Sequence, residues 1–185
     1  MEFFFFEGKL IEAKPFGIIV EFLSKHTSEV WKLVTVYGPC QSPACDEFVQ
    51  WLYNLDINCD DKWLLLGDFN FMRSLENRNL PGGNVSDIFL FNEIIGHLGL
   101  IELPIKGRQF TWSNMQSEPL LEQIDWFFTS VAWTWIIQTL WFFLLRDQHQ
   151  IMSLVLSQLP RPSPRLEFFA LKITGLTYLA FMSVL

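Results

Sequence analysis

Basic residues, paired cysteines and low-complexity tracts are scarce in this sequence, and each shortage excludes a class of protein. Lys and Arg total 13 against 20 Asp and Glu, for a formal net charge of −7. Because phosphate contacts need clustered positive charge, this balance disfavours a simple electrostatic nucleic-acid binder. The three cysteines form no Cys-x-x-Cys pair, so they indicate neither a disulfide framework nor a zinc site. The cysteine pattern favours a reducing, intracellular compartment. The acidic N-terminus, which has no basic stretch, is not typical of a signal peptide.

What the sequence does contain is apolar. Half of its 185 residues are hydrophobic and 16% are aromatic, which predicts a packed core. Charge is unevenly spread: residues 1–125 carry 9 Lys/Arg and 18 Asp/Glu, whereas residues 126–185 carry only 4 and 2. One domain seldom changes character so abruptly. The composition therefore predicts a domain over residues 1–134, followed by a degraded or frame-shifted apolar segment over 135–185.

Short apolar runs bounded by turn residues predict strands interleaved with two helices, hence a mixed α/β fold with a largely antiparallel sheet. The first helix is expected to start with Ser42 as N-cap and Pro43 at its first position. The second is expected over Asp87–His97, capped by Ser86. The strands are predicted at Phe16–Leu23, Val30–Tyr37, Trp63–Leu66, Leu100–Leu103, Gln109–Asn114 and Gln123–Thr129.

The segment Trp63–Asn70 (WLLLGDFN) ends a buried-strand pattern in a carboxylate and an amide. Residues two apart on an extended chain point to the same side, so Asp68 and Asn70 are expected to project together from a strand end. A carboxylate can deprotonate water and an amide can hold a phosphoryl oxygen, as metal-assisted phosphodiester hydrolysis requires. The alternative is a polar turn in which these side chains bond to their own backbone.

Three further motifs stand in order around this segment: Val36–Pro39 (VYGP), Phe110–Asn114 (FTWSN) and Gln123–Phe128 (QIDWFF). Together the four motifs resemble those of the endonuclease/exonuclease/phosphatase (DNase I-like) superfamily. Their residue sequences are most similar to those of the endonucleases of LINE-type retrotransposons. The resemblance covers about residues 16–130. It implies an α/β (α+β) fold, a DNase I-like four-layer sandwich of mostly antiparallel sheets, expected here to be incomplete at both ends. It also implies Mg²⁺ as cofactor, DNA as partner, association with a reverse transcriptase and a nuclear location.

The resemblance also implies site residues. Asp68 would be the catalytic acid/base that positions the attacking water. Asn70 would bind the scissile phosphate, Tyr37 would lie beside it, and Thr111 would support the site. Asp125 would orient a catalytic histidine, as the carboxylate of a triad does.

The sequence departs from the family pattern at three places. Cys40 stands where the family has an Asn shortly after its active-site Tyr. No Glu before Phe16 has the setting of the family's magnesium ligand, so the metal ligands stay unassigned, with Asp68 as one candidate. The Ser-Asp-His motif is absent, because Gln separates Asp147 from His149. These departures predict a catalytically inactive remnant of a Mg²⁺-dependent DNA endonuclease.

Two other functions stay open. Phe127–Leu145 is a run of 19 residues without a charge, long enough for a membrane-spanning helix, so a small membrane-associated polypeptide is one alternative. A sugar or inositol phosphatase of the same fold is the other. A change of reading frame near Thr134–Trp135 would explain the apolar segment, since codons compatible with His149–Leu154 encode Ser-Asp-His-Val-Pro in another frame.

Overall fold

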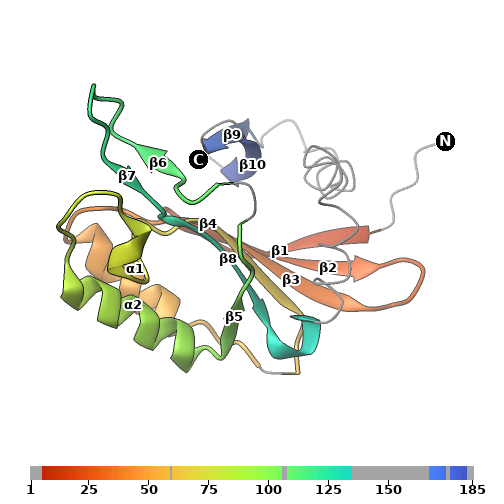
Figure 1. Cartoon of the computed structure of the whole chain (residues 1–185). Coiled ribbons are helices and arrows are strands. Elements are labelled where there is room, and N and C mark those ends of the chain that lie inside the picture. The colour runs from red at the N-terminus through yellow and green to blue at the C-terminus, as the bar shows by residue number, and fades with distance from the viewer. Residues whose placement is uncertain (1–5, 59, 106–107, 135–166, 174–175, 183–185) are drawn as a thin grey trace.

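A computed structural model describes residues 6–58, 60–105, 108–134, 167–173 and 176–182. Its main sheet has six strands in the order β1-β2-β3-β4-β8-β5 (Figure 1). These strands are β1 (Phe6–Lys14), β2 (Gly17–Ser24), β3 (Val30–Tyr37), β4 (Trp63–Asp68), β5 (Leu100–Glu102) and β8 (Asp125–Ser130). The β3–β4 pair is parallel and the other four pairs are antiparallel, which confirms the expected mixed and mostly antiparallel sheet.

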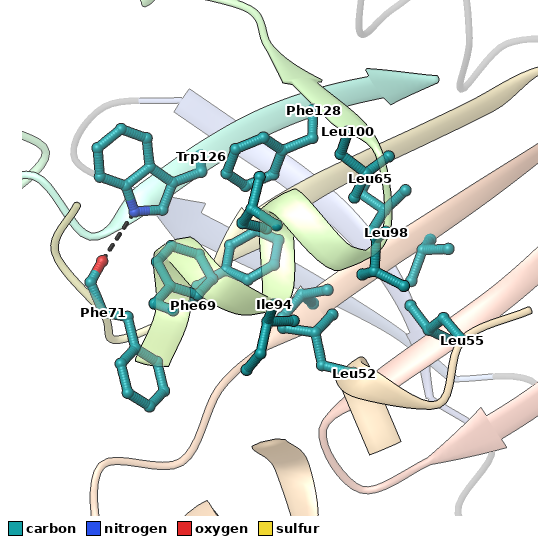
Figure 2. Packing of buried hydrophobic residues seen from close by; sticks show 14 of the residues in the cluster. Leu52, Leu55, Leu65, Phe69, Phe71, Ile94, Leu98, Leu100, Trp126 and Phe128 are labelled. Carbon is teal, nitrogen blue, oxygen red and sulfur yellow. Dashed lines mark hydrogen bonds between the residues drawn. The ribbon is translucent and has the colours of Figure 1, made fainter. Parts of the chain in front are cut away.

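Two helices, α1 (Ala44–Tyr53) and α2 (Val85–His97), lie on one side of this sheet (Figure 1). They bury an aromatic-rich core, in which each large side chain contributes about 2 kcal/mol of hydrophobic stabilisation. From the helices this core receives Phe48, Leu52, Phe91, Ile94 and Ile95, and from the sheet Val34, Val36, Leu65, Trp126 and Phe128. Figure 2 shows part of this packing, with Phe69 and Phe71 joining it from the segment after β4.

The opposite face of the sheet carries a second apolar cluster of Phe22, Trp31, Leu33 and Leu66. β4 contributes to both clusters, with Leu65 facing the helices and Leu66 facing away from them. A strand buried on both faces reads as a continuous apolar run, and the prediction of a central strand at Trp63–Leu66 is therefore confirmed. The strand continues through Gly67 to Asp68, so this carboxylate stands on the last position of β4.

Some predicted boundaries are wrong, for local reasons. Pro43, not Ser42, is the N-cap of α1, and no side chain caps that helix. α2 begins at Val85, before the expected Asp87, because the Asn84 side chain accepts a 3.0 Å hydrogen bond from the Ser86 N–H. β1 was not anticipated.

The strand predicted at Gln109–Asn114 shortens to β6 (Trp112–Ser113), which pairs with β7 (Leu121–Glu122) in a separate two-stranded sheet. Asn114 ends β6 because its side-chain oxygen accepts hydrogen bonds from the N–H groups of Gln116 and Leu120. These bonds stabilise a turn, so the backbone after Asn114 does not continue the strand pairing. A short 3₁₀ helix at Leu75–Asn77 completes the elements of this region.

The C-terminal predictions fall largely outside the described residues. β9 (Glu167–Ile173) and β10 (Leu176–Met182) pair antiparallel with each other. The proposed apolar helix at 127–145 is wrong at its start, since β8 runs to Ser130, and its part from residue 135 lies outside the described residues. Within the described part of the chain, no helix is long and apolar enough to cross a membrane.

Gly67 is the position at which a single substitution should damage the fold most specifically. Its φ is +139°, and a Cβ there would lie 2.0 Å from the Val36 carbonyl oxygen on β3. We expect Gly67→Ala to lower the free energy of unfolding by at least about 2 kcal/mol, measured by urea denaturation. Gly96→Ala is the control: apart from the adjoining residues and the backbone of its own helix, nothing lies within 4 Å of its added Cβ. In a helix the change should stabilise by about 0.5–1 kcal/mol. Equal effects of the two substitutions would contradict the close approach of β3 and β4.

Candidate active site

Three of the sequence-predicted site residues lie in one row across three neighbouring strands. Tyr37 on β3 pairs with Asp68 on β4, and Asp68 pairs with Asp125 on β8. Cα atoms paired in this way are about 5 Å apart, and the side chains of a row leave the same face of the sheet. Asp68 lies two residues after Leu66 on β4 and therefore shares its face, so this row faces away from the helices. Tyr37 is 56% exposed and Asp125 only 3%, so the row runs from the surface into a buried end.

Asn70 joins this row through two hydrogen bonds. Its backbone N–H donates to Asp68 Oδ1 over 2.9 Å, and its side-chain amide donates to the carbonyl oxygen of Gly38. The N–H of Gly38 in turn donates to the Asp68 carbonyl over 2.6 Å. Hydrogen bonds therefore join the ends of β3 and β4 at the site.

The expected reason for placing Asp68 and Asn70 together is wrong, although the two residues do lie together. Asn70 has a φ of +55°, so the chain after Asp68 turns instead of continuing as an extended strand. The bond from the Asn70 N–H to the Asp68 carboxylate is the side-chain-to-backbone bond of a polar turn, which was the alternative considered from the sequence. The polar turn therefore does not replace the candidate site, because it contains two of the site residues, Asp68 and Asn70.

Thr111 supports Asp125 from a neighbouring segment. Its hydroxyl oxygen accepts hydrogen bonds from the N–H groups of Ile124 and Asp125, at 3.1 and 3.2 Å. Asp125 Oδ1 is buried without any hydrogen-bond partner. A buried carboxylate oxygen without a partner is costly, which makes this group a candidate for a functional role.

Burial dominates the electrostatics of the two carboxyl groups. Loss of hydration raises the pKa of Asp68 to about 6, against the opposing effect of the Asn70 N–H. The pKa of Asp125 rises to about 7, mainly through burial, while the Thr111 hydroxyl lowers it, the neighbouring Asp68 raises it, and Arg108 lowers it. At neutral pH the pair is therefore partly protonated.

The histidines of the described residues lie away from the row. His26 is in the turn after β2, at the end of the sheet opposite to Tyr37. The His97 ring stacks on Tyr53 with 4.1 Å between centroids. Asp147 and His149 lie outside the described residues, and Cys40 is exposed three residues beyond Tyr37. In the part of the chain that is described, no three acidic, histidine or cysteine side chains gather in a way that could hold a metal ion.

Sequence reasoning missed three contributors to the site. Gly38 was noted only as part of the Val36–Pro39 motif, yet a Cβ there would lie 2.4 Å from the Phe69 carbonyl oxygen. Arg108 places positive charge near Asp125. The Trp126 indole N–H donates to the Phe71 carbonyl over 2.8 Å. The Gly-Pro pair was the one available signal, since a glycine at a strand end can mark a close backbone approach.

The arrangement of strands and helices is consistent with the DNase I-like fold that the motifs implied. The endonuclease domain of TRAS1, a telomere-specific non-LTR retrotransposon, superposes with a TM-score of 0.53 at 13% identity, over 67% of this chain and 56% of that domain. A second solved structure, D. rerio TDP2 complexed with a single-strand DNA product, is less similar, with a TM-score of 0.42 at 14% identity over 69% of this chain and 53% of that one.

In sequence, the chain is 26% identical over 89 residues to the Transposon TX1 uncharacterized 149 kDa protein of Xenopus laevis. The match covers 47% of this chain and 7% of that protein. No family model matches the chain. The resemblance drawn from the four motifs is thus confirmed as a shared fold, and the chain spans just over half of the TRAS1 domain.

The buried carboxyl pair predicts a specific pH dependence of stability. The folded-state pKa values of Asp68 and Asp125 are about 6 and about 7, above the value for Asp in an unfolded chain. The contribution of these two groups to the free energy of unfolding is therefore most favourable below about pH 4. It is lost as the pH rises through 6 and 7. We expect Asp125→Asn to be more stable than the wild type by about 2–4 kcal/mol at pH 8, with the difference vanishing near pH 4.

Urea denaturation at the two pH values measures this difference. Asp56→Asn is the matched control, because Asp56 is exposed and the substitution changes the net charge equally. A stability gain at pH 8 that is the same in both variants would show that net charge, and not burial of Asp125, is the cause.

Proposed function

We propose that the chain derives from a retrotransposon DNA endonuclease and retains the acid/base end of its phosphodiester-hydrolysing site, but does not itself cleave DNA. The observation that carries the proposal is the row of Tyr37, Asp68 and Asp125 across β3, β4 and β8. DNA as substrate is supported by the retrotransposon endonuclease that shares the fold and by the transposon protein that shares the sequence.

Asp68 is the group best suited to activate water. It ends a buried strand, it is only partly buried, and its pKa of about 6 lies close to neutral pH. A general base works best when its pKa is near the operating pH, since it is then both ionised and able to take a proton. Tyr37, exposed beside it, offers a hydroxyl group on the substrate side.

The carboxyl pair also has the donor chemistry for Mg²⁺. Mg²⁺ prefers oxygen ligands and uses one or two carboxylates together with water and substrate phosphates. Asp68 and Asp125 would supply those carboxylates, and the buried Oδ1 of Asp125 has no other partner. When bound, the ion would supply Lewis-acid stabilisation of charge on a phosphoryl oxygen.

Two departures from the family pattern support the absence of cleavage. No Glu before Phe16 has the setting of the family's magnesium ligand. The Ser-Asp-His motif is absent, because Gln148 separates Asp147 from His149. Members of one concerted site act together, so losing two of them costs several orders of magnitude in rate.

A plasmid-nicking assay tests the proposed lack of cleavage. Supercoiled DNA incubated with the chain and Mg²⁺ or Mn²⁺ should remain supercoiled, at the level seen with an Asp68→Ala variant. An assay of a retrotransposon endonuclease under the same conditions shows that nicking would be detected. Nicking by the wild-type chain that disappears in the Asp68→Ala variant would overturn the proposal and identify an active enzyme.

Cation binding by the carboxyl pair is testable without DNA. A ligand at a tenfold excess over its dissociation constant stabilises the folded state by about 1.4 kcal/mol, or about 3–5 °C in Tm for a chain of this size. We expect MgCl₂ to raise the Tm of the wild type by this amount relative to KCl at matched ionic strength. Asp125→Asn should abolish the rise and Asp56→Asn should preserve it. An equal rise in all three proteins would show a nonspecific salt effect.

A further inference from the structure

One buried hydrogen bond connects the two halves of the candidate active site from the helix-facing side of the sheet. The Trp126 indole N–H donates to the carbonyl oxygen of Phe71 over 2.8 Å, as Figure 2 shows. Trp126 directly follows Asp125, and Phe71 directly follows Asn70. The indole is 2% exposed, so water does not compete for this bond.

The segment that Trp126 holds is the one that shapes the site. It is the turn from Asp68 to Phe71, and it also meets β8 through the Phe69 N–H, which donates to the Ile124 carbonyl over 2.9 Å. The indole bond and this backbone bond thus both join the segment after Asp68 to the residues on either side of Asp125. Together they hold the turn against the start of β8.

Arg73 fixes the far end of the same segment. Its Nε donates to Asn92 Oδ1 on α2 over 2.9 Å, and Asn92 donates back to the Arg73 carbonyl over 2.8 Å. Its guanidinium lies over the Trp126 ring, 5.9 Å from the centroid, a separation typical of a cation–π contact. The Trp126 ring is therefore packed between Arg73 and the core, with its N–H directed at Phe71.

We propose that Trp126 is a positioning residue, which acts through the Phe71 carbonyl to hold Asp68 and Asn70 against Asp125. This role rests on the proposed function, since it matters for chemistry only if the carboxyl pair is the site. An aromatic side chain of similar bulk would fill the core but would leave the Phe71 carbonyl buried without a donor. The turn would then relax, and water would reach the carboxyl groups.

The chain offers a matched control in Trp63. It is also buried, at 4% exposed, and it belongs to the same core cluster. Its indole N–H has no hydrogen-bond partner, and it stands at the opposite end of β4 from Asp68. Trp63→Phe therefore removes the same atoms as Trp126→Phe without removing a hydrogen bond or opening space near the site.

The experiment compares the two variants by two measurements. Urea denaturation gives the global stability, and amide hydrogen exchange of the Phe69 and Asn70 N–H groups, which bond to Ile124 and Asp68, reports whether the turn is held. In Trp126→Phe we expect these two N–H groups to exchange at least about tenfold faster than the loss of global stability explains, because the turn opens locally. In Trp63→Phe we expect their exchange to change only as global stability does.

The proposal is overturned if Trp126→Phe loses stability while exchange of the Phe69 and Asn70 N–H groups follows global stability, as in Trp63→Phe. That result would mean a purely structural role. Should the Phe variant not fold, benzothienylalanine at position 126 fills nearly the same volume as Trp without an N–H, and the same two outcomes apply. Neither outcome depends on DNA cleavage, so the positioning role and the proposed function can fail separately.

Discussion

β4 runs parallel to β3 on one side and antiparallel to β8 on the other, and the rest of the structure depends on how closely it approaches β3. The approach is possible because Gly67 has no side chain: a Cβ would lie 2.0 Å from the Val36 carbonyl. Gly38 allows a second close approach, to the Phe69 carbonyl. Two glycines at adjacent strand ends thus let the backbones meet, and this contact brings Asp68 level with its neighbours in the sheet.

The site places two carboxyl groups where hydration is poor and like charges face each other. Such an arrangement opposes folding, and the protein offsets only part of the cost, through the Asn70 N–H, the Thr111 hydroxyl and the charge of Arg108. A pair kept under strain of this kind is typical of a functional site, because an apolar or amide substitute would stabilise the fold. The raised pKa values of the two carboxyl groups are therefore consistent with the proposed site.

Elements with a strong local pattern could be predicted from the sequence. β2, β3 and β4 follow from β-branched and aromatic runs bounded by turn residues, and the predicted and observed bounds agree closely. The ends of elements could not be predicted as well, because they depend on which side chain reaches a backbone N–H first. Asn84 displaces Ser86 as the cap of α2, and Asn114 converts most of a predicted strand into a turn.

By itself, the sequence determined the residue types of the site and the strand ends that carry them: Tyr37 after an apolar run, Asp68 after another, and Asp125 before a third. Only the tertiary structure decided that these positions share one register row, because register is set by strand pairing between segments far apart in the chain. It also decided that Asn70 reaches Asp68 through a left-handed turn and that Trp126 holds this turn from the other face. Local residue patterns specify strands and their faces, whereas burial, charge and contact at a site arise where separate strands meet.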